Sequence, residues 1–137
     1  VKRLITLSSV SNFDRYSERH KKEWKERGFF EVMNTRTKQR MRLNYSLLED
    51  LEKNKDRLDI EAAAKKIDIP WLIIHGTEDL AVDYSNAETL FNTGSPDNRE
   101  LVLLDNTGHT FGAGHPFEET TEALENVLTL IIDFLKK

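Results

Sequence analysis

Two residues, Asp79 and His109, carry side chains suited to acid–base chemistry at neutral pH, and each follows an apolar run that predicts a buried strand. Asp79 comes after residues 71–74, across a turn that contains Gly76, and His109 comes after residues 101–104 in a polar loop. Histidine is the usual general base near pH 7, because its pKa lies close to that pH. A carboxylate beside an imidazole orients the ring and stabilises it once it is protonated.

Each residue also has a simpler explanation when it is taken alone. The Gly-x-x-Asp segment at 76–79 is also typical of a plain turn in which Asp79 bonds its own backbone, and His109 is equally typical of a solvent-exposed loop histidine. The two residues together are stronger evidence for a site than either alone, because parallel neighbouring strands lie about 4.8 Å apart and end at the same edge of a sheet. Ligands of open α/β sheets bind outside those ends. We therefore predict that the two side chains lie within hydrogen-bond distance.

The order of elements predicts an α/β fold of parallel strands with helical crossovers. The runs at 4–7, 71–74 and 101–104 are apolar without polar alternation, which is typical of strands buried on both faces. Apolar residues of 117–136 recur at three- and four-residue spacing and predict a closing amphipathic helix. A shorter helix is predicted over 84–92, with Asp83 as its cap. The order from residue 71 is therefore strand, helix, strand, helix.

The stretch between the first two strands interrupts this order and indicates an insertion. Its predicted elements are a charged helix over 13–27 that ends at Gly28, a hairpin of 29–34 and 38–43 that turns near Thr35 and Arg36, and helices over 45–54 and 60–66. We expect a core strand in 1–10, a lid or cap insertion in 11–67, and core strands and helices in 68–137. The last segment would carry the acid and base loops.

The segments around Asp79 and His109 resemble those of the α/β-hydrolase superfamily. The run IPWLIIHGTED at 69–79 is similar to its P-x-L-x-x-x-G-x-x-D acid segment, and NTGHTF at 106–111 is similar to its GH-x-F base segment. The order acid then base matches the family order Ser, Asp, His. The resemblance covers 69–137 and, more loosely, 1–9, and it implies the C-terminal part of the fold with the insertion as a lid. The HTF and HPF segments at 109–111 and 115–117 resemble those of esterases near the dienelactone-hydrolase and serine-aminopeptidase groups.

This resemblance implies a serine hydrolase that acts on an ester, thioester or amide bond of a small-molecule or peptide substrate, with Asp79 as acid and His109 as base. No Gly-x-Ser-x-Gly occurs in the sequence, and Ser8 and Ser9 are predicted to be strand-end and loop residues. The nucleophile and the oxyanion hole are therefore expected in a missing N-terminal half, and we expect this chain to be an inactive piece by itself. No metal or organic cofactor is implied. The alternative is a non-catalytic α/β-hydrolase-like binding or scaffold protein.

Of the other three histidines, only His115 competes with His109 for the role of base. His115 precedes Pro116 at the start of the predicted closing helix, where the positive end of the helix dipole disfavours a protonated imidazole, so we favour His109 as the base. His75 lies on a predicted strand and His20 in a charged helix. Four histidines without a spaced carboxylate partner do not predict a zinc site.

Composition and charge argue against several classes of protein. The formal net charge of −4 gives no footprint for nucleic acid, and no apolar run approaches the roughly 20 residues that span a bilayer. The absence of cysteine excludes disulfides and thiolate metal sites and is in keeping with a cytoplasmic location. Residues 15–42 contain ten Lys and Arg against four Glu. This basic stretch would either attract an anionic substrate or, as we prefer, form a solvated surface.

Two further expectations concern surfaces. The apolar side chains of the insertion would either line an acyl pocket beneath the lid or, as is more common, pack the lid itself; they are Phe13, Trp24, Phe29, Phe30 and Met33. A sheet without its flanking strands has an open edge, which predicts self-association and hence a homo-oligomer.

Overall fold

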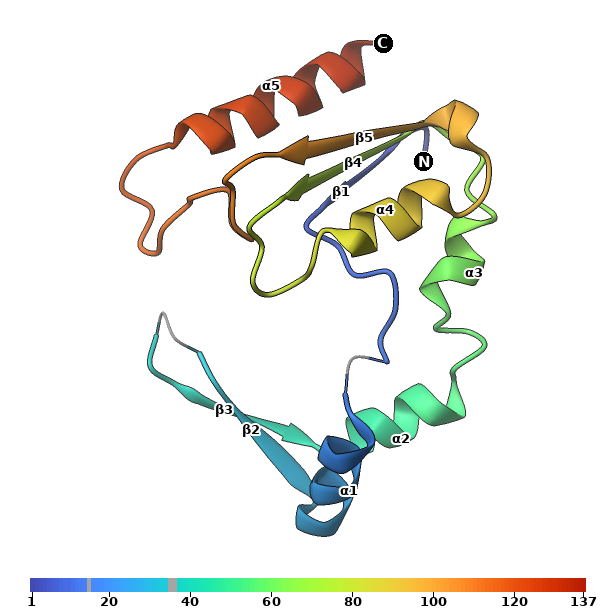
Figure 1. The fold of residues 1–137 in the computed structure, drawn as a ribbon, viewed down its shortest axis with the longest axis vertical. Helices are drawn as coiled ribbons and strands as arrows, with labels where there is room; N and C mark the ends of the chain where they lie inside the picture. The colour runs from blue at the N-terminus through green and yellow to red at the C-terminus, as the bar shows by residue number, and fades with distance from the viewer. Residues whose placement is uncertain (15, 35–36) are drawn as a thin grey trace. The chain divides into compact units, whose positions relative to one another are not determined.

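The computed structural model describes residues 1–14, 16–34 and 37–137, and it divides them into two compact units (Figure 1). The first unit comprises residues 1–12 and 60–137, and the second comprises residues 13–59. The elements of the first unit are β1 (Leu4–Leu7), α3 (Ile60–Ala64), β4 (Trp71–Gly76), α4 (Ser85–Asn92), the short 3₁₀ helix η1 (Pro96–Asn98), β5 (Arg99–Leu104) and α5 (Glu122–Lys136). Those of the second are α1 (Glu18–Arg27), β2 (Phe29–Met33), β3 (Arg40–Asn44) and α2 (Ser46–Lys53).

The sheet of the first unit is parallel throughout, which confirms the predicted α/β class. Its strand order is β1-β4-β5, with Leu4 opposite Trp71 at one end and Gly76 opposite Leu104 at the other. All six residues of β4 are buried, because this strand lies between two neighbours and has a helix on each face. Helix α4 forms the crossover from β4 to β5. The carboxyl ends of β4 and β5 therefore lie at the same edge.

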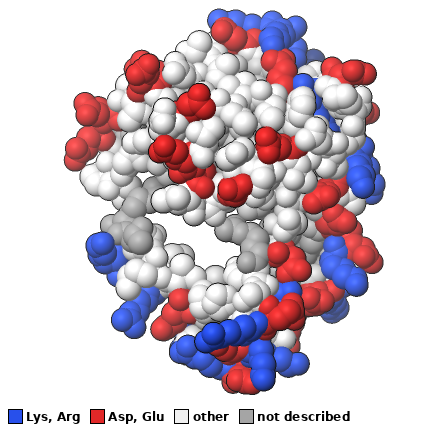
Figure 2. Space-filling model, in the orientation of Figure 1, with Lys and Arg blue, Asp and Glu red and all other residues white. Residues whose placement is uncertain are grey.

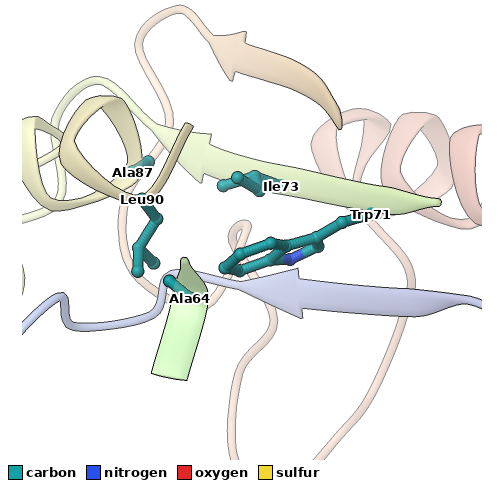
Figure 3. Close-up of a cluster of buried hydrophobic side chains, with 5 residues drawn as sticks. All are labelled: Ala64, Trp71, Ile73, Ala87 and Leu90. Atoms are coloured by element: carbon teal, nitrogen blue, oxygen red, sulfur yellow. The ribbon is translucent and has the colours of Figure 1, made fainter. Parts of the chain in front are cut away.

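Successive residues of β4 serve two separate hydrophobic clusters, as the two-residue period of a strand requires. Trp71 and Ile73 pack with residues of α3 and α4 on one face, where the side chains of Ala64, Trp71 and Leu90 point toward one another (Figure 3). The opposite face carries the second cluster, which consists of Leu72, Ile74, Phe111, Val127 and Phe134. Helix α5 covers this second face (Figure 1). The uninterrupted apolar run at 71–74 is thus explained by burial on both sides.

Arg99, at the start of β5, is a buried arginine that ties both helices of the first face to the sheet. Its guanidinium donates to the carbonyls of Leu90 and Thr93 at the end of α4, and to the carbonyl of Ala64 in α3 at 2.6 Å. The last carbonyls of a helix lack partners within the helix, so a buried cation stabilises them. The guanidinium carbon also lies 4.8 Å from the ring centre of Trp71. Burial lowers the pKa of Arg99 below its usual value.

Helix α5 begins at Glu122 rather than near residue 117, so the predicted start was wrong by one turn or more. The reason is Thr121, whose hydroxyl accepts a hydrogen bond from the Leu124 amide at 3.1 Å and so caps the helix. The three apolar side chains of α5 at positions 128, 132 and 135 are about half exposed; we call Leu128, Ile132 and Leu135 the α5 stripe. Within the described residues, no helix combines the length and the apolar character that crossing a bilayer requires.

The second unit contains the predicted hairpin, in which β2 and β3 pair antiparallel with Phe29 opposite Asn44. The predicted turn residues Thr35 and Arg36 lie outside the described residues. Helix α1 starts at Glu18, capped by the Ser17 hydroxyl, and ends at Gly28 with φ of 75°. Because glycine adopts this left-handed conformation without strain, the predicted stop is explained.

Trp24 forms the centre of the second unit. It is 2% exposed, its indole N–H donates to the Leu43 carbonyl at 3.0 Å, and its ring packs against Tyr16 and Phe30. Two of the proposed pocket residues, Trp24 and Phe30, therefore pack within this unit. On the face drawn in Figure 2, acidic side chains lie among the basic ones of the unit, in keeping with a solvated surface.

Candidate active site

The site is built where β4 and β5 end, because the loops that follow them are bonded to each other. The Thr77 amide donates to the Leu104 carbonyl at 3.0 Å, and the Glu78 amide donates to the Thr107 carbonyl at 3.0 Å. The Asn106 amide donates to the Thr77 hydroxyl at 3.1 Å. These bonds continue the strand pairing into the acid loop after β4 and the base loop after β5. The two loops consequently hold one relative position.

Gly76 permits this close approach. A Cβ atom at this position would lie 2.1 Å from the carbonyl oxygen of Thr107 and 2.7 Å from its carbonyl carbon. Both are backbone atoms and cannot rotate away as a flexible side chain would. The glycine of the Gly-x-x-Asp segment is therefore required by the contact between the two loops, in addition to any need of the turn itself.

The carboxylate of Asp79 is completely buried and is held through both oxygens. Its Oδ1 accepts hydrogen bonds from the amides of Ala81 and Val82, at 2.8 and 2.9 Å. Its Oδ2 lies 2.8 Å from Nδ1 of His109. Burial raises the pKa of Asp79, but the hydrogen bonds from Val82, His109 and Ala81 together lower it by more than burial raises it. The pKa therefore falls below its usual value. Asp79 is therefore an ionised carboxylate at neutral pH.

His109 has one ring nitrogen bound and the other available. An ionised carboxylate can only accept hydrogen bonds, so Nδ1 of His109 carries the proton that faces Asp79. The neutral ring then has a lone pair on Nε2. The His109 side chain is 44% exposed, while that of Asp79 is not exposed at all. An imidazole oriented by a buried carboxylate and open at its other nitrogen can accept a proton from a nucleophile.

The base loop is anchored to α5 by Phe111. This side chain is buried in the cluster with Val127 and Phe134, although its backbone has φ of 54°. A left-handed conformation is strained for a non-glycine residue and persists where the surroundings hold it. Here the Phe111 carbonyl accepts from the Thr121 hydroxyl at 2.6 Å, and its amide donates to the Gly108 carbonyl at 3.1 Å. The helix cap and the base loop thus share one threonine.

The structure brings the predicted pair Asp79 and His109 together, and it joins a third residue to them. His75, which the sequence placed on a strand, has Nε2 at 3.2 Å from Oδ2 of Asp79 and at 2.8 Å from the Val82 carbonyl oxygen. One signal was visible in the sequence: His75 is the one polar residue of the otherwise apolar run at 71–76, four residues before Asp79.

The competing candidates take no part in this contact. In the described parts of the chain, no hydrogen bond or ion pair joins His115 to Asp79, and His109 fills that position. Ser8 and Ser9 follow β1 as predicted, and the Ser9 hydroxyl donates to the Leu7 carbonyl. Over residues 1–14, 16–34 and 37–137, no group of three or more His, Cys, Asp or Glu side chains is arranged to hold a metal ion.

Comparison with known proteins identifies the architecture. No protein-family model matches the chain, and the search of curated protein sequences found no significant match. Solved structures do match. Mouse alpha/beta hydrolase domain-containing protein 10 aligns over 98% of this chain and 52% of its own, with a TM-score of 0.74 and 13% identity. A putative hydrolase from Agrobacterium vitis S4 aligns over 96% and 48%, with a TM-score of 0.67 and 20% identity.

A third match is Est1E from Butyrivibrio proteoclasticus, which covers 100% of this chain and 52% of its own, with a TM-score of 0.59 and 18% identity. The chain therefore spans about half the length of the structures that it matches. At these identities the likeness concerns the fold. The parallel sheet, the acid and base loops at one edge and these matches show that the chain has the α/β-hydrolase fold, in the C-terminal portion to which its sequence pointed.

Proposed function

We propose that this chain supplies the acid and the base of a serine hydrolase that cleaves an ester, thioester or amide bond, with the nucleophilic serine outside this sequence. The observation that carries the proposal is the 2.8 Å contact between Oδ2 of Asp79 and Nδ1 of His109, with the rest of the His109 ring half exposed. Asp79 and His109 are the proposed catalytic pair, and the second unit, residues 13–59, is the proposed lid.

In the proposed reaction, the serine oxygen attacks the carbonyl carbon of the substrate while Nε2 of His109 takes the serine proton. Nδ1 stays bound to Asp79, whose negative charge stabilises the imidazolium that forms. The imidazolium then gives its proton to the leaving alkoxide, thiolate or amine. Water then attacks the acyl carbon while Nε2 of His109 takes its proton, and the imidazolium returns that proton to the serine oxygen as the bond between serine and the acyl group breaks.

The environment of Asp79 suits this role. Two backbone amides bind Oδ1 and so help to keep the carboxylate directed at His109. Its complete burial removes competing water, which strengthens the attraction between the carboxylate and a protonated ring. Loss of the carboxylate in a comparable triad lowers kcat by about 10⁴-fold, because the imidazole takes the wrong tautomer.

Structural neighbours support an ester substrate in preference to a peptide. Besides Est1E, the matched structures include an esterase domain from Rhodothermus marinus and a monoacylglycerol lipase from Paleococcus ferrophilus. The lipase aligns over 98% of this chain with a TM-score of 0.67 and 14% identity. An acyl ester is therefore the first substrate class to test.

The test compares histidine variants of the full-length protein in the hydrolysis of p-nitrophenyl acetate and longer p-nitrophenyl esters. We expect His109→Gln to lower kcat by about 10⁴-fold or more, and the matched control His115→Gln to leave it unchanged. The 137-residue chain alone should show no turnover. The upstream sequence should contain Gly-x-Ser-x-Gly.

Other outcomes would count against the proposal. Turnover by the 137-residue chain that His109→Gln abolishes would place the nucleophile inside this sequence. Glycine or alanine at the centre of the upstream motif, with no turnover by the full-length protein, would favour a binding or scaffold protein with this fold.

A further inference from the structure

His75 is a fully buried polar residue within the apolar strand β4. Its side chain has no exposed surface, and the other residues of the strand before Gly76 are Trp, Leu and Ile. Burying an imidazole costs free energy unless its polar atoms are bonded, so an apolar side chain would serve packing better at this position. The contacts of His75 therefore need a reason beyond the core.

The partners of His75 determine which ring nitrogen carries its proton. Nε2 lies 2.8 Å from the Val82 carbonyl oxygen and 3.2 Å from Oδ2 of Asp79. A carbonyl and an ionised carboxylate can only accept, so Nε2 must carry a hydrogen. Nδ1 is buried and has no hydrogen-bond partner among the described residues, which favours a lone pair at that nitrogen. His75 is thus the Nε2–H tautomer, with its N–H directed at Val82.

These contacts hold Val82, in the loop after β4, between Asp79 and His75. The Val82 amide donates to Oδ1 of Asp79, while the Val82 carbonyl accepts from His75. The same N–H edge lies against Oδ2, the oxygen that faces His109. Rotation about the last torsion of an aspartate is soft, so the carboxylate needs external contacts to keep one oxygen in a fixed direction.

We propose that His75 is a positioning residue, which locks Val82 and the carboxylate of Asp79 so that Oδ2 stays directed at Nδ1 of His109. The proposal rests on the proposed function, since it assigns His75 to the service of that catalytic pair. It does not give His75 a contact with substrate. The expected consequence of its loss is a lower kcat with little change in KM, because only the base would be misaligned.

Two amide substitutions separate the role of the N–H from that of bulk. In His75→Gln the amide nitrogen can occupy the place of Nε2 and still donate to the Val82 carbonyl. In His75→Asn the amide nitrogen falls near the place of Nδ1, short of Val82. Both side chains are polar, uncharged and smaller than histidine, so their effects on packing are similar.

The experiment combines kinetics of the full-length protein with NMR of its ¹⁵N-labelled histidine rings. We expect wild type to show His75 as the Nε2–H tautomer and His109 as the Nδ1–H tautomer. His75→Gln should keep the His109 tautomer and a kcat within about threefold of wild type. His75→Asn should average the two His109 tautomers and lower kcat by up to about 100-fold, the loss that a misplacement of about 1 Å can cause.

Several results would overturn the proposal. One is a wild-type spectrum in which His75 carries its proton on Nδ1, and this test does not depend on whether any variant folds. Another is a His75→Asn protein that unfolds at lower temperature but keeps the His109 tautomer and kcat, since that would show a purely structural role. If wild type has no hydrolase activity, the proposed function fails, while the tautomers of both rings still test the positioning of Asp79 and His109.

Discussion

Gly76→Ala is the substitution that should most clearly disturb the site without touching a reacting group. The added Cβ would lie 2.1 Å from the Thr107 carbonyl oxygen, whereas ordinary contact begins at 3.4 Å. The base loop must therefore retreat by up to 1.3 Å (3.4 − 2.1). Added to the 2.8 Å between Asp79 and His109, a movement of that size takes the pair beyond hydrogen-bond distance.

The magnitude follows from overpacking against backbone. Inserting a methyl group into a filled site costs about 1–3 kcal/mol, and the high end applies here because the opposing atoms are a peptide group. A loss of about 3 kcal/mol corresponds to a fall of about 10 °C in the melting temperature of a domain of this size. Misplacement of the base by about 1 Å lowers kcat by about 100-fold.

Gly108→Ala is the matched control. A Cβ at that position would approach no atom closer than 3.9 Å, which is ordinary van der Waals contact, and this glycine lies in the same pair of loops. We expect its melting temperature to stay within about 2 °C of wild type. Thermal unfolding followed by circular dichroism compares both variants. Equal stability of the two alanine variants would refute the close approach of the loops at Gly76.

Three further predictions concern charge, capping and association. Because the folded chain holds the pKa of Asp79 below its ordinary value of about 3.9, the ionised carboxylate stabilises the fold above about pH 4, and this stability is lost as the pH falls through the folded-state pKa. Between about pH 5 and 2, the free energy of unfolding measured in urea should thus fall more steeply for wild type than for Asp79→Asn. Parallel plots of this free energy against pH would contradict the prediction. Thr121→Ala should cost about 1–2 kcal/mol in chemical unfolding through loss of the α5 cap and of the bond to the base loop, while the exposed Thr120→Ala should cost less than about 0.5 kcal/mol. The 137-residue chain alone should self-associate through its sheet edge or the α5 stripe. Light scattering should show less association for Leu128→Lys. A monomeric wild-type chain would contradict this prediction.

The sheet and the edge that carries the candidate site were predictable because they depend on local sequence patterns. Apolar runs without alternation marked β1, β4 and β5, and parallel strands leave their following loops at one edge. This pattern predicts that Asp79 lies beside His109, and the structure confirms the contact. Their catalytic roles stay a proposal.

What the sequence did not reveal depends on contacts between distant residues. The sequence showed His75 only as a polar residue in an apolar run. Its contact could not be predicted, because the partner is a backbone atom, the Val82 carbonyl, seven residues away. The start of α5 was missed because Thr121 caps the helix while also bonding the Phe111 carbonyl. The burial of Arg99 likewise depends on helix ends that only the fold brings together.

The insertion shows the same limit. The hairpin of the insertion and the end of helix α1 at Gly28 followed from local signals, whereas the first and last residues of the insertion did not. Helix α3 lies with the first unit, since Ala64 packs against Trp71 and Leu90 in the core beside β4. That residues 13–59 act as a lid over substrate stays a prediction, because the sequence pattern indicates a separate unit and does not indicate its function.

The most direct test of the acid–base pair is the rate constant with which a fluorophosphonate probe labels the full-length protein at about pH 7.5. Labelling needs an activated serine, and activation needs His109 held in one tautomer by Asp79. We predict that Asp79→Asn lowers this rate constant by about 10⁴-fold while the protein stays folded. Equal labelling of wild type and Asp79→Asn would contradict the assignment of Asp79 and His109.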